Sequence, residues 1–380
     1  MSFFLDHIER IAAGYKGNPP LAVFLKAYFK QYPKLGSRDR KALSEALYIY
    51  YRSKRFAPPA DSVLEVVAKG ITWCQSGNAF LKRMMEPVSA RMQGREAAQL
   101  PVDFKGLISP ALSEDTWLYS LWQQPRLFIR LRQRDNKVPQ LLAQQGISFD
   151  YVRIPGNEQQ DCLGIANGSA IDQWLPEQDY VIQDWASQAS MYALLDTLPA
   201  QPQSVWDVCS GAGGKSILLR DKLPAFSLCA TDVRGSILHN LQQRFKKYNL
   251  CKAEAFVLDS ADTMAVASQM KQRRFDLVLC DVPCSGSGTW ARTPEQFHFF
   301  KTEDLKKFEA LQYPIAYNAS RHVAPGGTLA YITCSVFEQE NEQVVQRLLQ
   351  TTDLKLVKQQ LIVGIEQQAD SLFIAVFRRS

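Results

Sequence analysis

One stretch of this chain, residues 204–222, constrains the fold more than any other. It begins with an apolar run from Ser204 to Val208, which is typical of a buried strand, and continues through small residues rich in glycine. From Lys215 to Lys222 the pattern becomes that of a helix. Glycine lets a ligand approach the backbone closely, and the first turn of a helix presents free N–H groups. The stretch therefore predicts a strand, a ligand-binding loop and a helix of an α/β fold.

The glycine loop lacks the spacing of two common nucleotide-binding motifs. A phosphate-binding P-loop needs a glycine five residues before Gly214, where Cys209 stands. A dinucleotide fingerprint needs a glycine three residues after Gly213, where Ser216 stands. Asp232 ends the next apolar run, and a carboxylate there can accept both hydroxyls of a ribose. A ribose site without a phosphate clamp favours S-adenosylmethionine, although the loop alone fits an ordinary glycine-rich turn equally well.

Strand and helix patterns alternate from about residue 184 to residue 380. The expected strands cover residues 204–209, 226–231, 255–258, 275–280, 327–333 and 372–377. The expected helices lie near residues 237–248, 261–271 and 305–322. Such alternation predicts a mainly parallel sheet with helices on both faces, whose ligands bind at the carboxyl ends of the strands. The polar side chains expected at those ends are Asp232, Asp259, Asp281 and Cys334.

The first half of the chain has a different organisation. Apolar residues recur at helical spacing up to about Leu100, which predicts an all-helical domain over residues 1–100 and a linker over 101–124. Residues 125–183 alternate between strand and helix patterns and predict a small α+β module of ferredoxin-like or RRM-like type. With residues 184–380 as the α/β domain, a chain of 380 residues is long enough for this arrangement.

Basic side chains are concentrated in the N-terminal part. Residues 1–150 hold 22 lysines and arginines against 13 acidic residues, whereas the remainder holds 22 against 25. A polyanion-binding surface has such a bias, but a solvated helical face explains it more simply. Arg38, Arg40 and Lys41 lie in the first turn of an expected helix, where cations are unfavourable, and this placement hints at an external anion. Arg130 lies on one face of the module's first strand, which suits either a nucleic-acid backbone or solvent.

Composition and spacing disfavour several other classes of protein. Eight cysteines are scattered without a C-x-x-C pair, and four histidines show no H-E-x-x-H spacing, which argues against a disulfide framework and a zinc site. No apolar stretch approaches the roughly 20 residues of a membrane span, and the N-terminus has no signal-peptide pattern. We therefore expect a cytoplasmic protein with neither a metal nor a membrane partner, and take it to be a monomer.

Two cysteines differ from the others because each follows an expected strand end. Cys284 lies in the segment Asp281-Val-Pro-Cys-Ser-Gly-Ser-Gly-Thr, and Cys334 lies in Thr-Cys-Ser. Either one alone is more simply a buried structural cysteine. Both together, beside an adenosine-type site, indicate methylation of a pyrimidine at C5, because a thiolate that adds to C6 makes C5 nucleophilic. A base then removes the C5 proton and the thiolate leaves, while a carboxylate such as Asp281 favours the addition.

These motifs resemble the Sun/Fmu family (NOP2/Sun, RsmB-type) of S-adenosylmethionine-dependent RNA cytosine-C5 methyltransferases. The resemblance covers roughly residues 125–380, and Glu340-Asn-Glu342 and Pro325-Gly-Gly327 are further matches. The N-terminal helices more weakly resemble the NusB-like RNA-binding domain of the bacterial member that acts on 16S ribosomal RNA. The fold that the resemblance implies is a class I methyltransferase, Rossmann-like with a mainly parallel sheet, preceded by an all-helical domain and a small α+β module.

The resemblance also implies roles for individual residues. Cys334 would be the nucleophile, Cys284 would assist proton removal and release, and Asp281 would contact the cytosine and border the methyl donor. Asp232 would hold the ribose of the donor, and Asp259 would face its adenine. The loop that would wrap the donor consists of Cys209, Ser210, Gly211, Ala212, Gly213, Gly214 and Lys215. The expected RNA contacts are Arg292, Arg130, Arg38, Arg40 and Lys41.

The prediction is therefore an enzyme that methylates cytosine C5 in RNA through a covalent adduct, with 16S ribosomal RNA as the leading substrate. Transfer RNA is the alternative substrate. A rival from another class is a non-catalytic RNA-binding factor in ribosome assembly, whose sequence signature would be the loss of Cys334 or Asp281. A metal or redox protein is disfavoured by the spacing of the cysteines.

Overall fold

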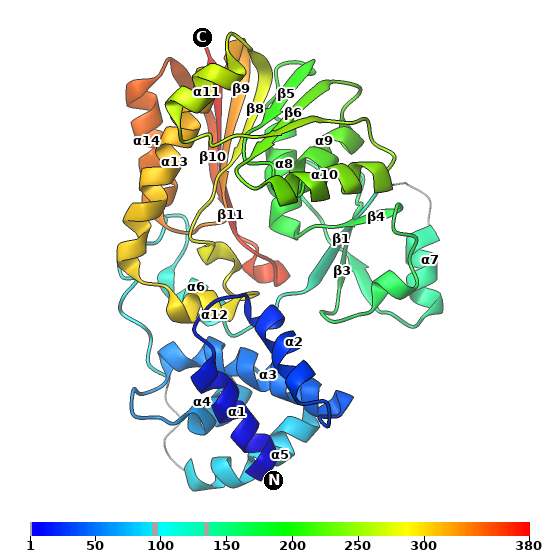
Figure 1. The fold of residues 1–380 in the computed structure, drawn as a ribbon, viewed down its shortest axis with the longest axis vertical. Coiled ribbons are helices and arrows are strands. Elements are labelled where there is room, and N and C mark those ends of the chain that lie inside the picture. The colour runs from blue at the N-terminus through cyan, green and yellow to red at the C-terminus, as the bar shows by residue number, and fades with distance from the viewer. Residues whose placement is uncertain (1, 93–97, 133–136) are drawn as a thin grey trace. The chain divides into compact units, whose positions relative to one another are not determined.

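The structure is a computed structural model, which describes residues 2–92, 98–132 and 137–380 (Figure 1). The chain divides into two compact units, and each is described by itself. We name them the helical unit and the sheet unit. The helical unit comprises Met1–Gly106, Ser113–Gln124 and Thr289–Thr302, and the sheet unit comprises Leu107–Leu112, Pro125–Gly288 and Glu303–Ser380.

The helical unit consists of short helices and 3-10 turns around an apolar core. Their bounds are α1 (Ser2–Gly14), α2 (Leu21–Gln31), α3 (Ser37–Ser53), η1 (Lys54–Phe56), α4 (Val63–Trp73), α5 (Ala79–Ser89), η2 (Ala90–Met92), α6 (Glu114–Ser120) and α12 (Pro294–Phe299). Helix α4 begins with a capping box, in which the Ser62 N–H donates to Glu65 Oε2 at 2.8 Å and the Glu65 N–H donates to Ser62 Oγ at 3.3 Å. Helices α3 and α4 pack closely at Gly70, because a Cβ there would lie 2.4 Å from Ser53 Oγ.

A segment from late in the chain, residues 289–302, belongs to the helical unit. The indole of Trp290 lies 5.6 Å from that of Trp117 between ring centroids, and Phe297 lies 5.7 Å from Phe104. The N–H of Leu21, at the start of α2, donates to Glu295 Oε1 at 3.1 Å. Aromatic packing and this capping bond therefore hold the segment within the helical unit, although it directly follows the predicted Cys284 motif.

The sheet unit contains a sheet whose strand order within the described residues is β10-β11-β9-β8-β5-β6-β7. The strands β5 to β9 run parallel, whereas β11 is antiparallel to both β9 and β10. The bounds are β5 (Ser204–Asp207), β6 (Ser227–Asp232), β7 (Glu254–Val257), β8 (Phe275–Asp281), β9 (Val323–Thr333), β10 (Leu354–Ile362) and β11 (Leu372–Arg379). The order reverses between β5 and β8, and ligands of open α/β sheets bind at such a switch point.

Helices cover both faces of this sheet (Figure 1). One core cluster joins the sheet to α8 (Trp185–Leu195), α9 (Gly214–Lys222) and α10 (Gly235–Lys247). The other joins it to α11 (Thr263–Met270), α13 (Leu305–Ser320) and α14 (Glu342–Thr351). Short 3-10 turns follow three of the strands, namely η4 (Ser287–Thr289), η6 (Glu338–Glu340) and η7 (Ile365–Gln367), and η5 (Thr302–Asp304) directly precedes α13. The mainly parallel sheet between two helical layers confirms the predicted fold class.

The remaining part of the sheet unit is a small antiparallel sheet with strand order β2-β3-β1-β4. Its elements are β1 (Leu127–Leu131), α7 (Lys137–Gln144), β2 (Phe149–Tyr151), β3 (Cys162–Ile165), η3 (Ile171–Gln173) and β4 (Tyr180–Ile182). This is the strand order of a ferredoxin-like arrangement, with the short turn η3 where a second helix would stand. Ile129 and Leu131 of β1 pack into the core of this small sheet, whereas Phe128 packs into a core cluster of the large one.

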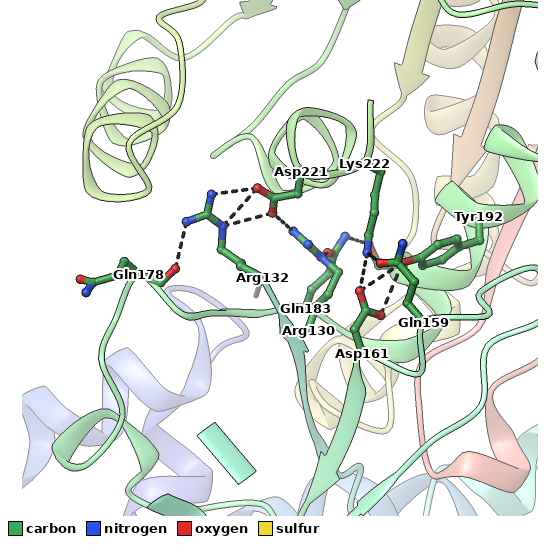
Figure 2. A network of polar contacts seen from close by, with 10 residues as sticks. Arg130, Arg132, Gln159, Asp161, Gln178, Gln183, Tyr192, Asp221 and Lys222 are labelled. Carbon is green, nitrogen blue, oxygen red and sulfur yellow. Dashed lines mark hydrogen bonds and ion pairs between the residues drawn. The ribbon is translucent and has the colours of Figure 1, made fainter. Parts of the chain in front are cut away.

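Arg130 of β1 is fully buried, which corrects the prediction that this face of the strand meets RNA or solvent. Its Nη2 lies 2.7 Å from Asp221 Oδ2 in α9, and Arg132 Nη2 lies 2.8 Å from the other oxygen of the same carboxylate (Figure 2). Nearby, Lys222 Nζ lies 2.5 Å from Asp161 Oδ2. The face is covered because the small sheet packs against α9, and the arginine series forms the polar part of that contact.

No helix among residues 2–92, 98–132 and 137–380 combines the length and the apolar character that crossing a membrane requires.

Candidate active site

The glycine loop leaves β5 and reaches the start of α9 at Gly214. The Ser210 N–H donates to Thr231 O at 2.8 Å, which ties the loop to β6. Gly211 and Gly213 have φ values of +51° and +77°, a region that favours glycine. A Cβ at Gly211 would meet no atom within 4 Å, so this part of the loop borders open space.

Asp232 ends β6 and faces the same loop. Its Oδ2 accepts from the Gly211 N–H at 3.1 Å, and its Oδ1 accepts from Nε of Arg234 at 3.0 Å. Burial alone would raise the pKa of Asp232, but the hydrogen bonds from Arg234 and Gly211 outweigh it and lower the pKa. The carboxylate is therefore an ionised acceptor. The Arg234 side chain is 64% exposed, so it can move into solvent when a ribose hydroxyl takes its place at the Asp232 carboxylate.

Lys215 and Asp281 form an ion pair at the switch point of the sheet. Lys215 lies in the first turn of α9, and its Nζ is 2.6 Å from Asp281 Oδ2 at the end of β8. Burial would lower the pKa of Lys215, but Asp281 more than offsets it, and the charge of a Cys334 thiolate adds to the rise. The pair thus joins the predicted donor loop to the segment that carries Cys284.

Asp207 is a site residue that the sequence prediction missed. It ends β5 and is 1% exposed, and its Oδ2 accepts from Ser216 Oγ at 2.6 Å. Burial raises the pKa of Asp207 to about 7, with a smaller opposing effect from the Ser216 hydroxyl. Its Oδ1 and the hydroxyl of Ser210 are buried polar atoms without a protein partner. The signal that could have identified it is an Asp at the end of a short strand, four residues before Gly211, the first glycine of the loop.

The two predicted catalytic cysteines lie side by side. The sulfur atoms of Cys284 and Cys334 are 3.2 Å apart, and the Cys334 N–H donates to Cys284 Sγ at 3.3 Å. The hydrogen bond with Cys334, followed by burial, holds the pKa of Cys284 well above that of a free thiol. The Gly288 N–H donates to Cys334 O at 2.9 Å. Either sulfur atom can donate a hydrogen to the other across this contact.

The other predicted residues are placed as follows. Asp259 follows β7 on the surface, where its Oδ1 accepts from the Ala261 N–H at 3.0 Å. The half-buried Arg292 belongs to the helical unit, as do Arg38, Arg40 and Lys41 in the first turn of α3. Arg38 is exposed and lies 4.3 Å from the ring centroid of Phe80, and Arg40 Nε donates to Leu35 O at 2.8 Å. Arg130 alone is enclosed.

The donor set of this region suits an adenosine-type methyl donor. An ionised carboxylate at Asp232 accepts hydroxyl groups, and open space borders Gly211 and Gly214. The unpaired hydroxyl of Ser210 lies in the same loop. No group of three or more His, Cys, Asp or Glu side chains among the described residues is placed to hold a metal ion. The site can thus bind a nucleoside next to a pair of thiols and an ion pair.

The reversed strand order, the glycine loop after β5 and the acid after β6 define a class I methyltransferase fold, whose methyl donor is S-adenosylmethionine. Residues 194–375 match the family model described as 16S rRNA methyltransferase RsmB/F. This part of the chain is therefore similar to the methyltransferase domain of the RsmB/F family, which agrees with the resemblance predicted from the cysteine motifs.

Individual relatives agree with this assignment. Ribosomal RNA small subunit methyltransferase B of Shewanella oneidensis is 34% identical over 176 residues, which are 46% of this chain and 40% of that protein. The crystal structure of PH0851 superimposes with a TM-score of 0.68 at 18% identity and covers 98% of this chain and 97% of its own. A methyltransferase homolog protein from Pyrococcus horikoshii gives a TM-score of 0.56 at 21% identity, covering 70% and 90%. These two structures show the fold.

Proposed function

We propose that this protein transfers a methyl group from S-adenosylmethionine to C5 of a cytosine in RNA, with 16S ribosomal RNA as the substrate. The observation that supports it most directly is the 3.2 Å separation of the Cys284 and Cys334 sulfur atoms beside the Lys215–Asp281 pair. Methylation at an unactivated pyrimidine carbon needs one thiolate to add to the ring and a second group to manage the proton. Two adjacent thiols with a carboxylate provide this set.

Each residue has a defined part in the proposed reaction. S-adenosylmethionine, when bound, supplies an electrophilic methyl group. The Cys334 thiolate bonds to C6, which moves the C5–C6 electron pair toward C5, and C5 takes the methyl group. A base takes the C5 proton with the assistance of Cys284, the electron pair of that C–H bond reforms the double bond, and Cys334 leaves C6 as a thiolate. Asp281 contacts the cytosine, and Lys215 orients the Asp281 carboxylate.

The choice of RNA rests on the family match and on charge. The matched family is described as 16S rRNA methyltransferase, and the first 150 residues hold a surplus of nine positive charges. The exposed Arg38 and Lys41 of α3 belong to this basic part, so we assign RNA binding to the helical unit. A polyanion binds to such a surface with a strong dependence on salt.

Tritium transfer tests the proposal. Labelled S-adenosylmethionine is incubated with total RNA from cells that lack this protein, using wild type beside Cys334→Ala. We expect label at cytosine C5 with wild type alone, in RNA of 16S size. Label in transfer RNA would replace the substrate with the alternative one. No label in any RNA or in small-subunit precursors, despite donor binding by calorimetry, would overturn the proposal in favour of a non-catalytic assembly factor.

A further inference from the structure

The carboxylate of Glu340 lies between the two segments that carry Cys284 and Cys334. Glu340 is in η6, and its side chain is fully buried. Each of its two carboxylate oxygens accepts two hydrogen bonds. Oε1 accepts from the Ser285 N–H and from Gln312 Nε2, each at 2.8 Å. Oε2 accepts from Ser285 Oγ and Ser335 Oγ, each at 2.5 Å. One buried side chain is therefore bonded to the residue after each cysteine.

Further bonds hold the Cys284 segment against the same cluster. Gln312 of α13 also donates from Nε2 to Pro283 O at 3.0 Å, so the residues on both sides of Cys284 are held. Ser287 Oγ accepts from the Val336 N–H at 2.9 Å and lies 3.1 Å from Ser335 Oγ. The loop after β8 is thus bonded to the loop after β9 at several points.

Asn341, the residue after Glu340, bonds to both neighbours of Cys334. Asn341 Oδ1 accepts from Thr333 Oγ1 at 2.6 Å, and Asn341 Nδ2 donates to Ser335 O at 2.9 Å. Thr333 and Ser335 flank Cys334. The Tyr331 hydroxyl donates to Glu340 O at 2.6 Å, which fixes the backbone of η6 to β9. Both neighbours of Cys334 are therefore bonded to one short turn.

We propose that Glu340 is a positioning residue, whose buried carboxylate joins the Cys284 segment to the Cys334 segment and sets the separation of the two sulfur atoms. Buried carboxylates cost free energy unless hydrogen bonds satisfy them, and here all four partners are neutral donors. The negative charge is also close enough to Cys284 to contribute to the rise in its pKa, which favours the thiol form of Cys284. The consequence for methyl transfer rests on the proposed function, whereas the consequence for the thiols does not.

Two substitutions at this position separate shape from charge. In Glu340→Gln the amide oxygen can accept from the two N–H donors on one side, and the amide nitrogen can donate to the two hydroxyls on the other, since hydroxyls also accept. Glu340→Ala removes all four bonds. Glu338→Gln is the matched control, because Glu338 lies in the same 3-10 turn and is half-buried.

The measurement is the binding of phenylarsine oxide, which forms two As–S bonds to neighbouring thiols and releases one water molecule. Mass spectrometry locates the bridged cysteines, and Cys284→Ser gives the background from the other cysteines. We expect Glu340→Ala to weaken bridging of Cys284 and Cys334 by about tenfold or more, and Glu340→Gln and Glu338→Gln to stay within about twofold of wild type. Thermal unfolding shows whether Glu340→Ala is folded. If it is not, Ser285→Ala and Ser335→Ala each remove one of the four bonds to Glu340 in its place.

Two readouts keep this inference distinct from the proposed function. Arsenical bridging that is unchanged in folded Glu340→Ala, or in both serine variants, would overturn the positioning role whatever the enzyme methylates. The rate of alkylation of Cys284 against pH reports the charge, and Glu340→Gln should shift that profile to lower pH, whereas an identical profile would overturn this part of the inference. If bridging depends on Glu340 but no RNA is methylated, the positioning role stands and only the proposed function fails.

Discussion

The ammonium group of Lys215 lies 2.6 Å from the carboxylate of Asp281 and is almost fully enclosed, with 11% of its side chain exposed. The contact links the first turn of α9 to the end of β8, and so connects the donor loop with the Cys284 segment. In Lys215→Met the charge-assisted bond, worth about 1.5–3 kcal/mol, is lost. We expect single-turnover methyl transfer to fall by about 10- to 150-fold, at roughly tenfold per 1.4 kcal/mol. Donor binding by calorimetry, measured in parallel, would show whether the loss comes from binding, and an unchanged rate would contradict the assigned role of the pair.

The two thiols should give opposite results when each is removed. Without Cys284, the Cys334–C6 bond can form but its release is impaired, so Cys284→Ala should accumulate a covalent RNA–protein complex. Cys334→Ala should form none, because the nucleophile is missing. Denaturing gels with end-labelled RNA detect the complex as a slower band. The double variant is the control and should give no band, and the complex appearing in Cys334→Ala instead would reverse the two assignments.

The enclosed Asp221 should contribute far more to stability than an exposed carboxylate of the same kind. Asp221 is bonded to both Arg130, which is fully buried, and Arg132. Removing it in Asp221→Ala leaves a buried guanidinium without its counter-charge, and the expected loss in the free energy of unfolding is about 3–5 kcal/mol. Urea unfolding measures it.

Asp150 is the matched control for Asp221. It pairs with Arg126, but its side chain is 59% exposed, so Asp150→Ala should cost about 0–1 kcal/mol. Equal losses in the two variants would mean that the contact between the small sheet and α9 does not depend on the buried pair.

Gly288 marks a close approach of the backbone next to the thiols. A Cβ at this position would lie 2.0 Å from Ser371 O and 3.1 Å from Cys334 O. Gly288→Ala should therefore force the Cys284 loop away from Ser371, the residue before β11, with a loss of about 1–3 kcal/mol in stability. Methyl transfer should fall by about 100-fold, as expected for a misplacement of about 1 Å. Gly77→Ala, where a Cβ would meet no atom within 4 Å, is the control and should change stability by less than about 0.5 kcal/mol.

Local patterns in the sequence predicted the sheet, the glycine loop and the cysteine positions, because each depends on residues close together in the chain. The apolar run before Gly211 and the acid at Asp232 need only the rule that parallel strands end at one edge. The fate of Arg130 could not be predicted in this way. Alternation shows that it lies on one face of β1, but only the fold shows that α9 covers that face.

Long-range contacts explain the other omissions. Glu340 and Ser285 are 55 positions apart, so no spacing rule reveals that a carboxylate bonds the loop after Cys284. Trp290 follows the cysteine motif directly, yet its aromatic partner Trp117 is in the helical unit. Strand β10 was not expected, because the polar residues between Leu354 and Ile362 suit an edge strand whose side chains are mostly exposed.

Asp207 is buried at the end of β5, and no cation among the described residues contacts its carboxyl oxygens. Its pKa is raised from 3.8 to about 7. The folded state therefore keeps a proton that the unfolded chain has already lost between these two pH values, so folding stability falls as pH rises through this window. The loss is about 4 kcal/mol for a shift of this size and is complete above pH of about 7.

Asp207→Asn isolates this effect because the amide does not titrate. Wild type and variant should show similar pH dependence below about pH 4 and should diverge up to about pH 7, with the variant gaining relative stability. Urea unfolding of both proteins at a series of pH values measures the difference, and the cost of the altered hydrogen bond to Ser216 cancels because it is the same at every pH. Parallel stability profiles across the window would show that Asp207 is ionised at its ordinary pKa, and would require a cation or solvent at the unpaired Oδ1.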